Sequence, residues 1–214
     1  MSEIKKKSIL VSLCVILVAV ACAYAVQTIT NPKIKGVTII ARVYELKPDG
    51  TVVELGTQTT YISSHGSYHW VRTNPNGKID QEYVADASRG GFFSVNNNEG
   101  KAAKLAGFKP KDTPFSDAEG HRKNPQFVRE ETVLGFRGFV NRVVIDGTVD
   151  SELTFISEFD ILPVKQVHFL EDGSKRIIEP TSIEVGEPDE HHFKLPSNLT
   201  VHDALMKLPS TQNN

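Results

Sequence analysis

Apolar and polar residues alternate along much of the chain. From residue 37 to residue 44, every second position carries one of four apolar residues: Val37, Ile39, Ala41 and Val43. The positions between them include Thr38 and Arg42. Successive side chains of a β-strand point to opposite faces of a sheet, so this period of two predicts a strand with one buried face. Residues 151–159 alternate in the same way, which is typical of an antiparallel sheet with one face in water.

Four short turn signals separate β-rich stretches. They are Pro48-Asp49-Gly50, Asn74-Pro75-Asn76-Gly77, Asp146-Gly147 and Asp172-Gly173. Asn-Gly and Asp-Gly tolerate the positive φ angles that tight hairpins need, so these dipeptides indicate hairpins. Segments of strand length and composition span residues 37–44, 51–62, 66–73, 78–85, 127–134, 136–145, 151–159, 162–170 and 175–185. With shorter stretches, we expect about ten or eleven strands, paired mostly with sequence neighbours.

Helix is scarce in the pattern. Residues 101–106 could form a turn of helix or a short strand, and residues 201–207 could form a short terminal helix. Residues 108–125, with several prolines and charges, are the longest expected loop and divide the sheet into two meanders. Neither half has enough apolar residues to fold alone, so residues 26–196 are expected to form one β-rich domain. Residues 197–214 are expected to be a C-terminal tail.

Residues 1–25 have the three parts of a secretory signal. Lys5-Lys6-Lys7 supplies the positive region, residues 9–21 the apolar run, and Ala23-Tyr24-Ala25 the small residues that signal peptidase accepts. Cleavage before Val26 is the favoured interpretation. It predicts a mature domain outside the cytoplasm, in the periplasm or at the cell surface.

Other interpretations of the same segment remain open. The apolar run can be extended from residue 9 to residue 26, which is just long enough for an uncleaved membrane anchor. The sequence Ala19-Val20-Ala21-Cys22 loosely resembles a lipobox, in which Cys22 would be acylated. Both would hold the domain at a membrane, still outside the cytoplasm. A buried core helix is the remaining interpretation.

Charge and cysteine content exclude several classes of function. Removing the leader removes one acid and three bases, which changes the formal net charge from −2 to −4. No basic field suited to a phosphate backbone remains, so we do not expect nucleic acid as a partner. Both cysteines, Cys14 and Cys22, lie in the leader. The mature chain would then have no thiolate nucleophile and no disulfide.

Candidate catalytic and metal-binding patterns are weak. Adjacent histidines such as His191 and His192 would point opposite ways in an extended segment, and His65 and His69 would lie about 13 Å apart on a strand. Ser64-His65-Gly66-Ser67 is not a nucleophile elbow. Glu130-Glu131 favours solvated charge over a carboxylate pair. We therefore assign no catalytic residue, no metal ligand and no cofactor.

Aromatic residues from many predicted strands are the more informative set. Six of them are candidates for an apolar ligand-binding face: Trp70, Phe92, Phe136, Phe139, Phe155 and Phe159. They could equally form the ordinary core under a curved sheet. A large sheet with little helix has few elements to cover its inner face, which favours an accessible cavity.

Three stretches support a resemblance to a known superfamily. They are Ser-Ser-His-Gly-Ser-Tyr-His-Trp at residues 63–70, Glu-Thr-Val-Leu-Gly-Phe-Arg at 131–137, and Glu-Pro-Asp-Glu-His-His-Phe-Lys-Leu-Pro at 187–196. With the order of strands and turns over residues 36–196, the chain resembles the lipoprotein-localisation-factor superfamily and, more closely, uncharacterised exported bacterial proteins. The resemblance implies a half-barrel sheet that often encloses an apolar cavity. The helical plug of such cavities is expected to be missing here, and the superfamily has no catalytic residues to carry over.

These observations predict an all-β, strongly curved antiparallel sheet of the half-barrel type, preceded by an N-terminal signal or anchor helix. The expected role is to bind a hydrophobic small molecule, a lipid or an envelope protein, without catalysis. One alternative is a structural or signalling protein that offers a sheet edge to a partner strand. Another is an unrecognised hydrolase or metal-dependent enzyme.

Overall fold

The computed structural model describes residues 36–107, 122, 124–156, 158 and 163–203. Within these ranges there is one sheet of twelve strands, and the helix whose bounds are described is a short one of the 3-10 type. The elements are β1 (Val37–Leu46), β2 (Val52–Ile62), β3 (Tyr68–Thr73), β4 (Ile79–Asp86), β5 (Gly91–Asn96), β6 (Lys101–Gly107), β7 (Phe127–Val133), β8 (Phe136–Ile145), β9 (Thr148–Ile156), β10 (Lys165–Phe169), β11 (Lys175–Val185), η2 (Glu190–Phe193) and β12 (Thr200–Asp203).

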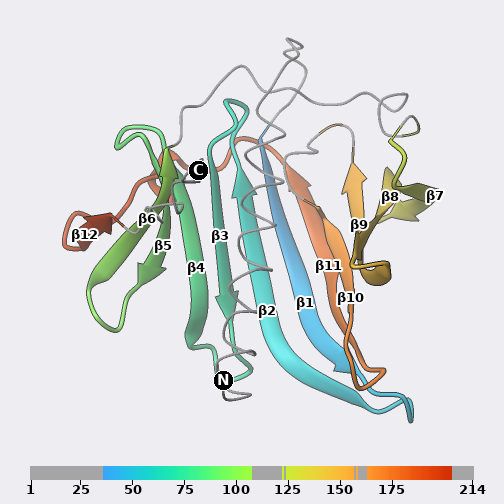
Figure 1. Cartoon of the computed structure of the whole chain (residues 1–214). Helices are drawn as coiled ribbons and strands as arrows, with labels where there is room; N and C mark the ends of the chain where they lie inside the picture. Colours follow the sequence, from blue (N-terminus) through green and yellow to red (C-terminus); the bar gives the residue numbers. More distant parts are fainter. Residues whose placement is uncertain (1–35, 108–121, 123, 157, 159–162, 204–214) are drawn as a thin grey trace, which may run out of the picture.

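The sheet consists of two meanders joined through β1 and β11. Its strand order is β12-β6-β5-β4-β3-β2-β1-β11-β10-β9-β8-β7, so the blue β1 and the orange β11 lie side by side in the middle (Figure 1). Ile39 pairs with Ile183 and Val43 with Ile178 across this junction. All pairs are antiparallel except β12 with β6. The terminal strands β12 and β7 do not meet, which leaves an open half-barrel and confirms the predicted fold class.

The predicted hairpin turns are confirmed. Gly77 and Gly173 have φ angles of 76° and 80°. In the Asp146-Gly147 turn, Asp146 itself has a positive φ of 50°. A fifth tight turn, Leu134-Gly135, joins β7 to β8. Leu134 has φ of 48°, an unusual conformation for a bulky residue, and its side chain is exposed.

Several sequence-based expectations need correction or completion. Lys101–Gly107 is a strand, which was one of the two alternatives for residues 101–106, and Thr200–Asp203 forms β12 at the start of the stretch where a short helix was expected. Both segments gain backbone hydrogen-bonding partners from the neighbouring strand, which local propensity does not reveal. The sheet thus continues beyond residue 196.

Several predicted features lie outside the described residues. They are the leader with Cys22, Ala23 and Ala25, nearly all of the 108–125 loop, and Phe159. No helix among the described segments is long and apolar enough to cross a membrane.

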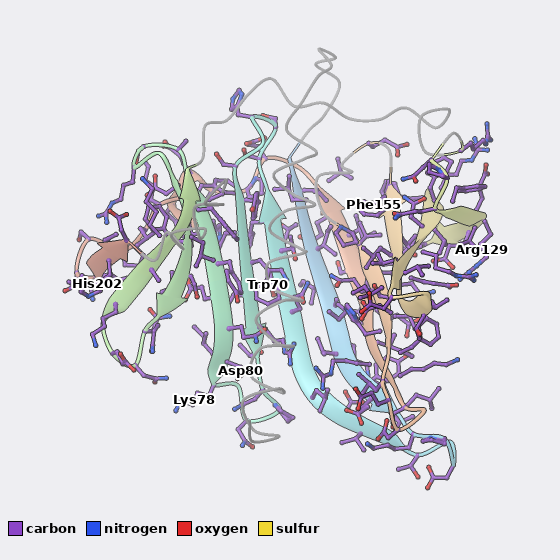
Figure 2. The ribbon with its side chains drawn as sticks, viewed as in Figure 1. Trp70, Lys78, Asp80, Arg129, Phe155 and His202 are labelled. Carbon is purple, nitrogen blue, oxygen red and sulfur yellow. The ribbon has the colours of Figure 1, made fainter. Side chains whose placement is uncertain are left out.

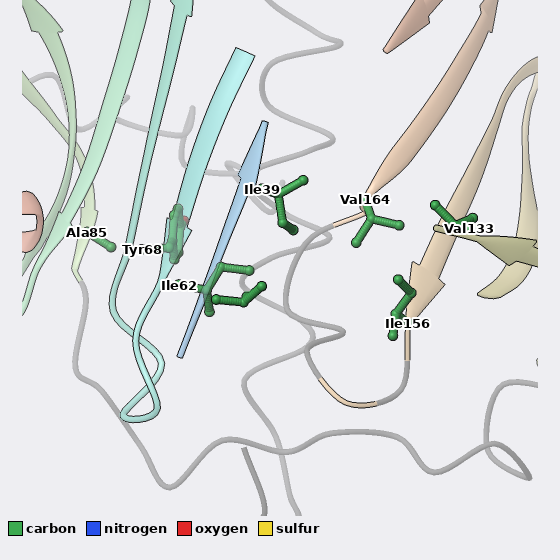
Figure 3. Packing of buried hydrophobic residues seen from close by; sticks show 8 residues of the cluster. Ile39, Ile62, Tyr68, Ala85, Val133, Ile156 and Val164 are labelled. Carbon is green, nitrogen blue, oxygen red and sulfur yellow. The ribbon is translucent and has the colours of Figure 1, made fainter. Parts of the chain in front are cut away.

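A row of buried apolar side chains runs across the sheet. It extends from Ala85 and Tyr68 through Ile62 and Ile39 to Val164 (Figure 3), where Ile156 and Val133 complete the cluster. A second cluster lies over β4, β5 and β6 and includes Leu195 and Leu199 of the C-terminal segment, residues 187–203. The row spans both meanders, so one apolar cluster joins the two parts of the sheet.

Candidate ligand-binding face

Strand register assigns the candidate aromatic residues to faces of the sheet. Trp70 lies directly opposite Thr60 of β2 and Tyr83 of β4, and Phe92 of β5 lies opposite Ala85. Because side chains alternate along a strand and directly paired residues share a face, Trp70, Tyr83 and Phe92 project from the same side. We call this side the tryptophan face. Figure 2 shows Trp70 in the middle of the sheet, far from both terminal strands.

Three aromatic contacts join these side chains into a continuous ladder. The ring centroids of Trp70 and Tyr83 are 4.9 Å apart, those of Tyr83 and Phe92 are 5.7 Å apart, and those of Tyr68 and Phe92 are 5.5 Å apart. These separations are typical of favourable aromatic pairs. Tyr68 is buried, whereas Trp70, Tyr83 and Phe92 are only half-buried. The ladder therefore presents apolar ring surface to solvent.

The other predicted site residues fall into separate places. Phe139 of β8 and Phe155 of β9 are direct partners on the tryptophan face, but β2, β1, β11 and β10 lie between them and Trp70. Phe139 is buried, and Phe155 is half-buried. Phe136 packs against the apolar row. The structure thus brings Trp70 and Phe92 together through Tyr83.

Tyr83 was missing from the sequence-based set. Tyr83 lies between the buried residues Glu82 and Val84 in β4, so the period of two predicts that its side chain is on the opposite face from theirs. The same pattern does not show which side chains of the neighbouring strands lie beside it. Burial raises the pKa of Tyr83, against a hydrogen bond with Ser94 that lowers it. Its ring therefore acts as a neutral, largely apolar surface at neutral pH.

Polar side chains continue the tryptophan face beyond the ladder. Arg72 follows Trp70 two positions later in β3 and lies opposite Gln58 of β2. On the far side of β1, His168 of β10 lies opposite Arg176 of β11. Burial lowers the pKa of His168; the charge of Asp150 opposes this, and those of Arg176 and Arg72 add to it. The face therefore combines apolar rings with a neighbouring cationic region.

The opposite face is covered by the C-terminal segment over β3–β6. Leu195 and Leu199 pack with Phe93 and Val84, and the Leu195 amide donates a hydrogen bond to Asp86 Oδ2 at 2.9 Å. At its start, the carboxylate of Glu187 accepts hydrogen bonds from the amides of Ser64 and Gly36. Two of the stretches that support the resemblance, residues 63–70 and 187–196, therefore lie against each other.

The histidine arrangement differs from the sequence-based expectation. His191 and His192 belong to the 3-10 turn η2, and their rings lie 4.0 Å apart rather than pointing opposite ways. His192 stacks on Tyr61, while His69 forms a hydrogen bond of 3.0 Å with Glu82. Over the part of the chain that the structure describes, no three His, Cys, Asp or Glu side chains are arranged to hold a metal ion.

A polar cavity lies where β4 and β5 separate. It has a volume of about 490 Å³ and is lined by residues 78–83 and 94–98. β4 pairs with β5 only from Tyr83 to Asp86, so Ile79 to Glu82 have a strand partner on the β3 side alone. The cavity thus exposes an interrupted stretch of strand edge inside the sheet.

Comparison with known proteins gives a likeness in fold only. No family model and no curated protein matches the sequence. An uncharacterised conserved protein from Thermus thermophilus has a TM-score of 0.47 at 10% identity, over 79% of this chain and 90% of that one. A LolA superfamily protein from Nitrosomonas europaea has a TM-score of 0.39 at 8% identity, over 83% and 97%.

A third similar structure is that of Pseudomonas aeruginosa MucB in complex with MucA. Its TM-score is 0.39 at 18% identity, over 78% of this chain and 58% of that protein. The superfamily that the sequence resembles is therefore represented among the similar structures. Because every one of these TM-scores lies below 0.5, the likeness concerns the course of the strands, and the function is argued from the side chains.

Proposed function

We propose that the protein is a non-catalytic binding protein of the cell envelope that holds a hydrophobic ligand on the tryptophan face. The observation that carries the proposal is the ladder of Trp70, Tyr83 and Phe92, whose rings touch in series and are only partly buried. A cluster of this kind at mid-sheet is unlike scattered surface hydrophobics and is typical of a binding surface.

The energetics of burial support a ligand of low polarity. Covering apolar surface contributes about 25 cal/mol per Å², so a chain laid over several partly buried rings gains affinity without any polar contact. The hydroxyl groups of Tyr83 and Ser94 and the side chain of Thr60 border the rings and can orient a polar group of the ligand. The face is therefore suited to binding and orientation, and catalysis is not part of the proposal.

Export to the cell envelope is the second part of the proposal. It rests on the leader, with Lys5-Lys6-Lys7, the apolar run and the small residues Ala23 and Ala25. We expect the mature N-terminus to be Val26, and N-terminal sequencing of protein from the envelope fraction measures this. A chain that begins at acylated Cys22, or that retains the three lysines, would contradict it.

The ladder can be tested with Nile red, an uncharged hydrophobic probe that fluoresces when bound. The folded full chain should bind Nile red, and Trp70→Leu should weaken binding about tenfold, because it removes the central ring surface. Tyr44→Leu is the matched control, since Tyr44 is a half-buried aromatic residue on the opposite face of β1. Equal binding by wild type and Trp70→Leu, with unchanged melting temperatures, would show that the ladder is not the binding surface.

A second candidate function is supported by the interrupted edge of β4. A partner strand could add to Ile79–Glu82 by backbone hydrogen bonds, as extended peptides do at free sheet edges. Asp80→Pro would remove a backbone donor there and should abolish partner binding while leaving Nile red binding unchanged. Loss of both activities in Asp80→Pro would count against a separate edge function.

A further inference from the structure

Two arginines on the tryptophan face lack the close partners that other arginines in the sheet have. The Nε atoms of Arg72 and Arg176 are buried and have no hydrogen-bond partner. Arg142 Nε is unpaired as well, but the Nη2 atom of Arg142 contacts Glu152 at 2.8 Å. Buried polar atoms are normally satisfied, so an unmet donor marks a place where an accepting group belongs.

The carboxylates nearest to these arginines lie beyond hydrogen-bond distance. Arg72 Nε is 3.7 Å from Asp80 Oδ2, and Arg176 Nη2 is 3.8 Å from Glu45 Oε2. Glu45 also pairs with Lys47, which takes up part of its charge.

Arginines on β7 and β8 show the contrast. Arg129 and Arg142 each contact Glu152 at 2.8 Å, and Arg137 contacts Glu130 at 2.6 Å. Their guanidinium groups are matched by carboxylates at full hydrogen-bond contact. The positive charge of Arg72 and Arg176 is therefore less completely neutralised than that of Arg129, Arg137 and Arg142.

The unmet donors lie next to the aromatic ladder. Arg72 is the next residue after Trp70 on the same face of β3, and Gln81 of β4 lies opposite it as Tyr83 lies opposite Trp70. His168 and Arg176 face the same side from β10 and β11, with Asp150 and Glu45 as the acidic groups nearby. An apolar surface thus ends at a cationic one within a single step of the strand.

We propose that the ligand of the tryptophan face is a single-chain amphiphile with an anionic oxygen headgroup, a carboxylate or a phosphate. The chain lies along Trp70, Tyr83 and Phe92, and the headgroup accepts hydrogen bonds from Arg72. The planar guanidinium group matches the oxygens of both headgroups, which is why arginine recognises them better than lysine does. Arg176 adds to the positive field across β1 and β2. This inference rests on the proposed function.

The experiment compares charged and uncharged amphiphiles of the same chain. Trp70 is the single tryptophan of the sequence, so its fluorescence reports the site directly. The full chain is titrated with palmitate, with lysophosphatidic acid of the same acyl chain, and with methyl palmitate. The acids should bind about tenfold more tightly than the ester, because a hydrogen bond to a charged group is lost in the ester. The better of the two acids identifies the headgroup.

Two variants test the role of Arg72. Arg72→Gln should remove the preference for the acids and leave the affinity for methyl palmitate unchanged. Arg129→Gln is the matched control, because Arg129 is an ion-paired arginine on the distant β7, and it should keep the preference. If Arg72→Gln fails to fold, the salt dependence of the wild type decides: acid affinity should fall at high salt, and ester affinity should not.

The possible results separate this inference from the function beneath it. Equal affinities for acid and ester, independent of salt, overturn the anionic headgroup and leave a hydrophobic site intact. An acid preference that survives in Arg72→Gln overturns the assignment to Arg72. If the wild type binds neither the amphiphiles nor Nile red, the proposed function itself fails.

Discussion

The imidazole ring of His192 lies on the phenol ring of Tyr61, with centroids 3.7 Å apart and planes 12° from parallel. Tyr61 belongs to β2, whereas His192 belongs to η2 in the C-terminal segment. The contact therefore joins the first meander to the last described part of the chain. Because histidine titrates near neutral pH, the attachment of this segment to the sheet is expected to depend on pH.

Stability should fall when the pH is lowered from about 7.5 to about 5.5. Burial lowers the pKa of His192, and the charges of His191 and His69 lower it further, against the opposing charge of Asp189. The pKa of His168 is lowered as well, by burial first. The unfolded chain therefore binds protons at a higher pH than the folded chain does. The stability that His192 and His168 contribute in this way is complete above the ordinary histidine pKa. It is lost as the pH falls through the lower pKa values of the two histidines in the folded chain.

Urea melts at the two pH values measure this effect. His192→Phe keeps a ring against Tyr61 but has no titrating group, so its midpoint should change less with pH than that of the wild type. His202→Phe is the control, because His202 is exposed in β12 and should leave the pH dependence unchanged. A wild-type midpoint that is the same at both pH values would contradict the prediction.

Asp86→Ala should lower the free energy of unfolding by about 2–4 kcal/mol, because hydrogen bonds to a buried carboxylate are among the stronger ones. The oxygens of Asp86 accept hydrogen bonds from the amides of Leu195, Ser88 and Arg89, and the residue is 1% exposed. Although burial alone would raise the pKa of Asp86, these hydrogen bonds lower it.

The control for Asp86→Ala is Asp49→Ala. Asp49 accepts a hydrogen bond from the Thr51 amide in an exposed turn. Asp49→Ala should therefore lower the free energy of unfolding by less than about 1 kcal/mol. Limited proteolysis adds a local readout, since the C-terminal segment should become cleavable in Asp86→Ala and stay protected in Asp49→Ala. Equal stability losses in the two variants would show that Asp86 does not hold the segment.

Gly77→Val and Gly173→Val should each lower the free energy of unfolding by about 1–3 kcal/mol, because a β-branched residue resists positive φ. Both glycines have φ near 80° in hairpin turns. Gly186→Val is the matched control, since Gly186 has no positive φ and no atom within contact distance of an added Cβ. Urea melts that match the wild type in both turn variants would contradict the assigned turns.

Leu134→Asn should act in the opposite direction and raise the free energy of unfolding by about 1 kcal/mol. Leu134 has φ of 48° and is 51% exposed, so asparagine would relieve the backbone at little cost in burial. Chemical denaturation measures the gain. Leu134→Ala serves as control: it removes the exposed side chain but keeps the conformational penalty, so it should gain nothing.

Local patterns were sufficient for the elements but not for all of their ends. The period of two in β1 and the Asp-Gly and Asn-Gly turns identified strands and hairpins because both are set by neighbouring residues. A short helix was expected as possible over residues 201–207, because β6, the strand that pairs with Thr200–Asp203 in the described part of the chain, lies far away in the sequence. The histidine pair was placed in an extended segment, whereas a 3-10 turn brings the two rings together.

The sequence by itself determined an all-β chain of successive hairpins with one apolar face per strand, since alternation and turn chemistry act over a few residues. Only the tertiary structure decided which strands meet. The junction of β1 with β11 set the open half-barrel, and the register of β3, β4 and β5 placed Tyr83 between Trp70 and Phe92. Neighbours across a sheet depend on pairing between distant segments, and a one-residue change of register moves every side chain to the other face.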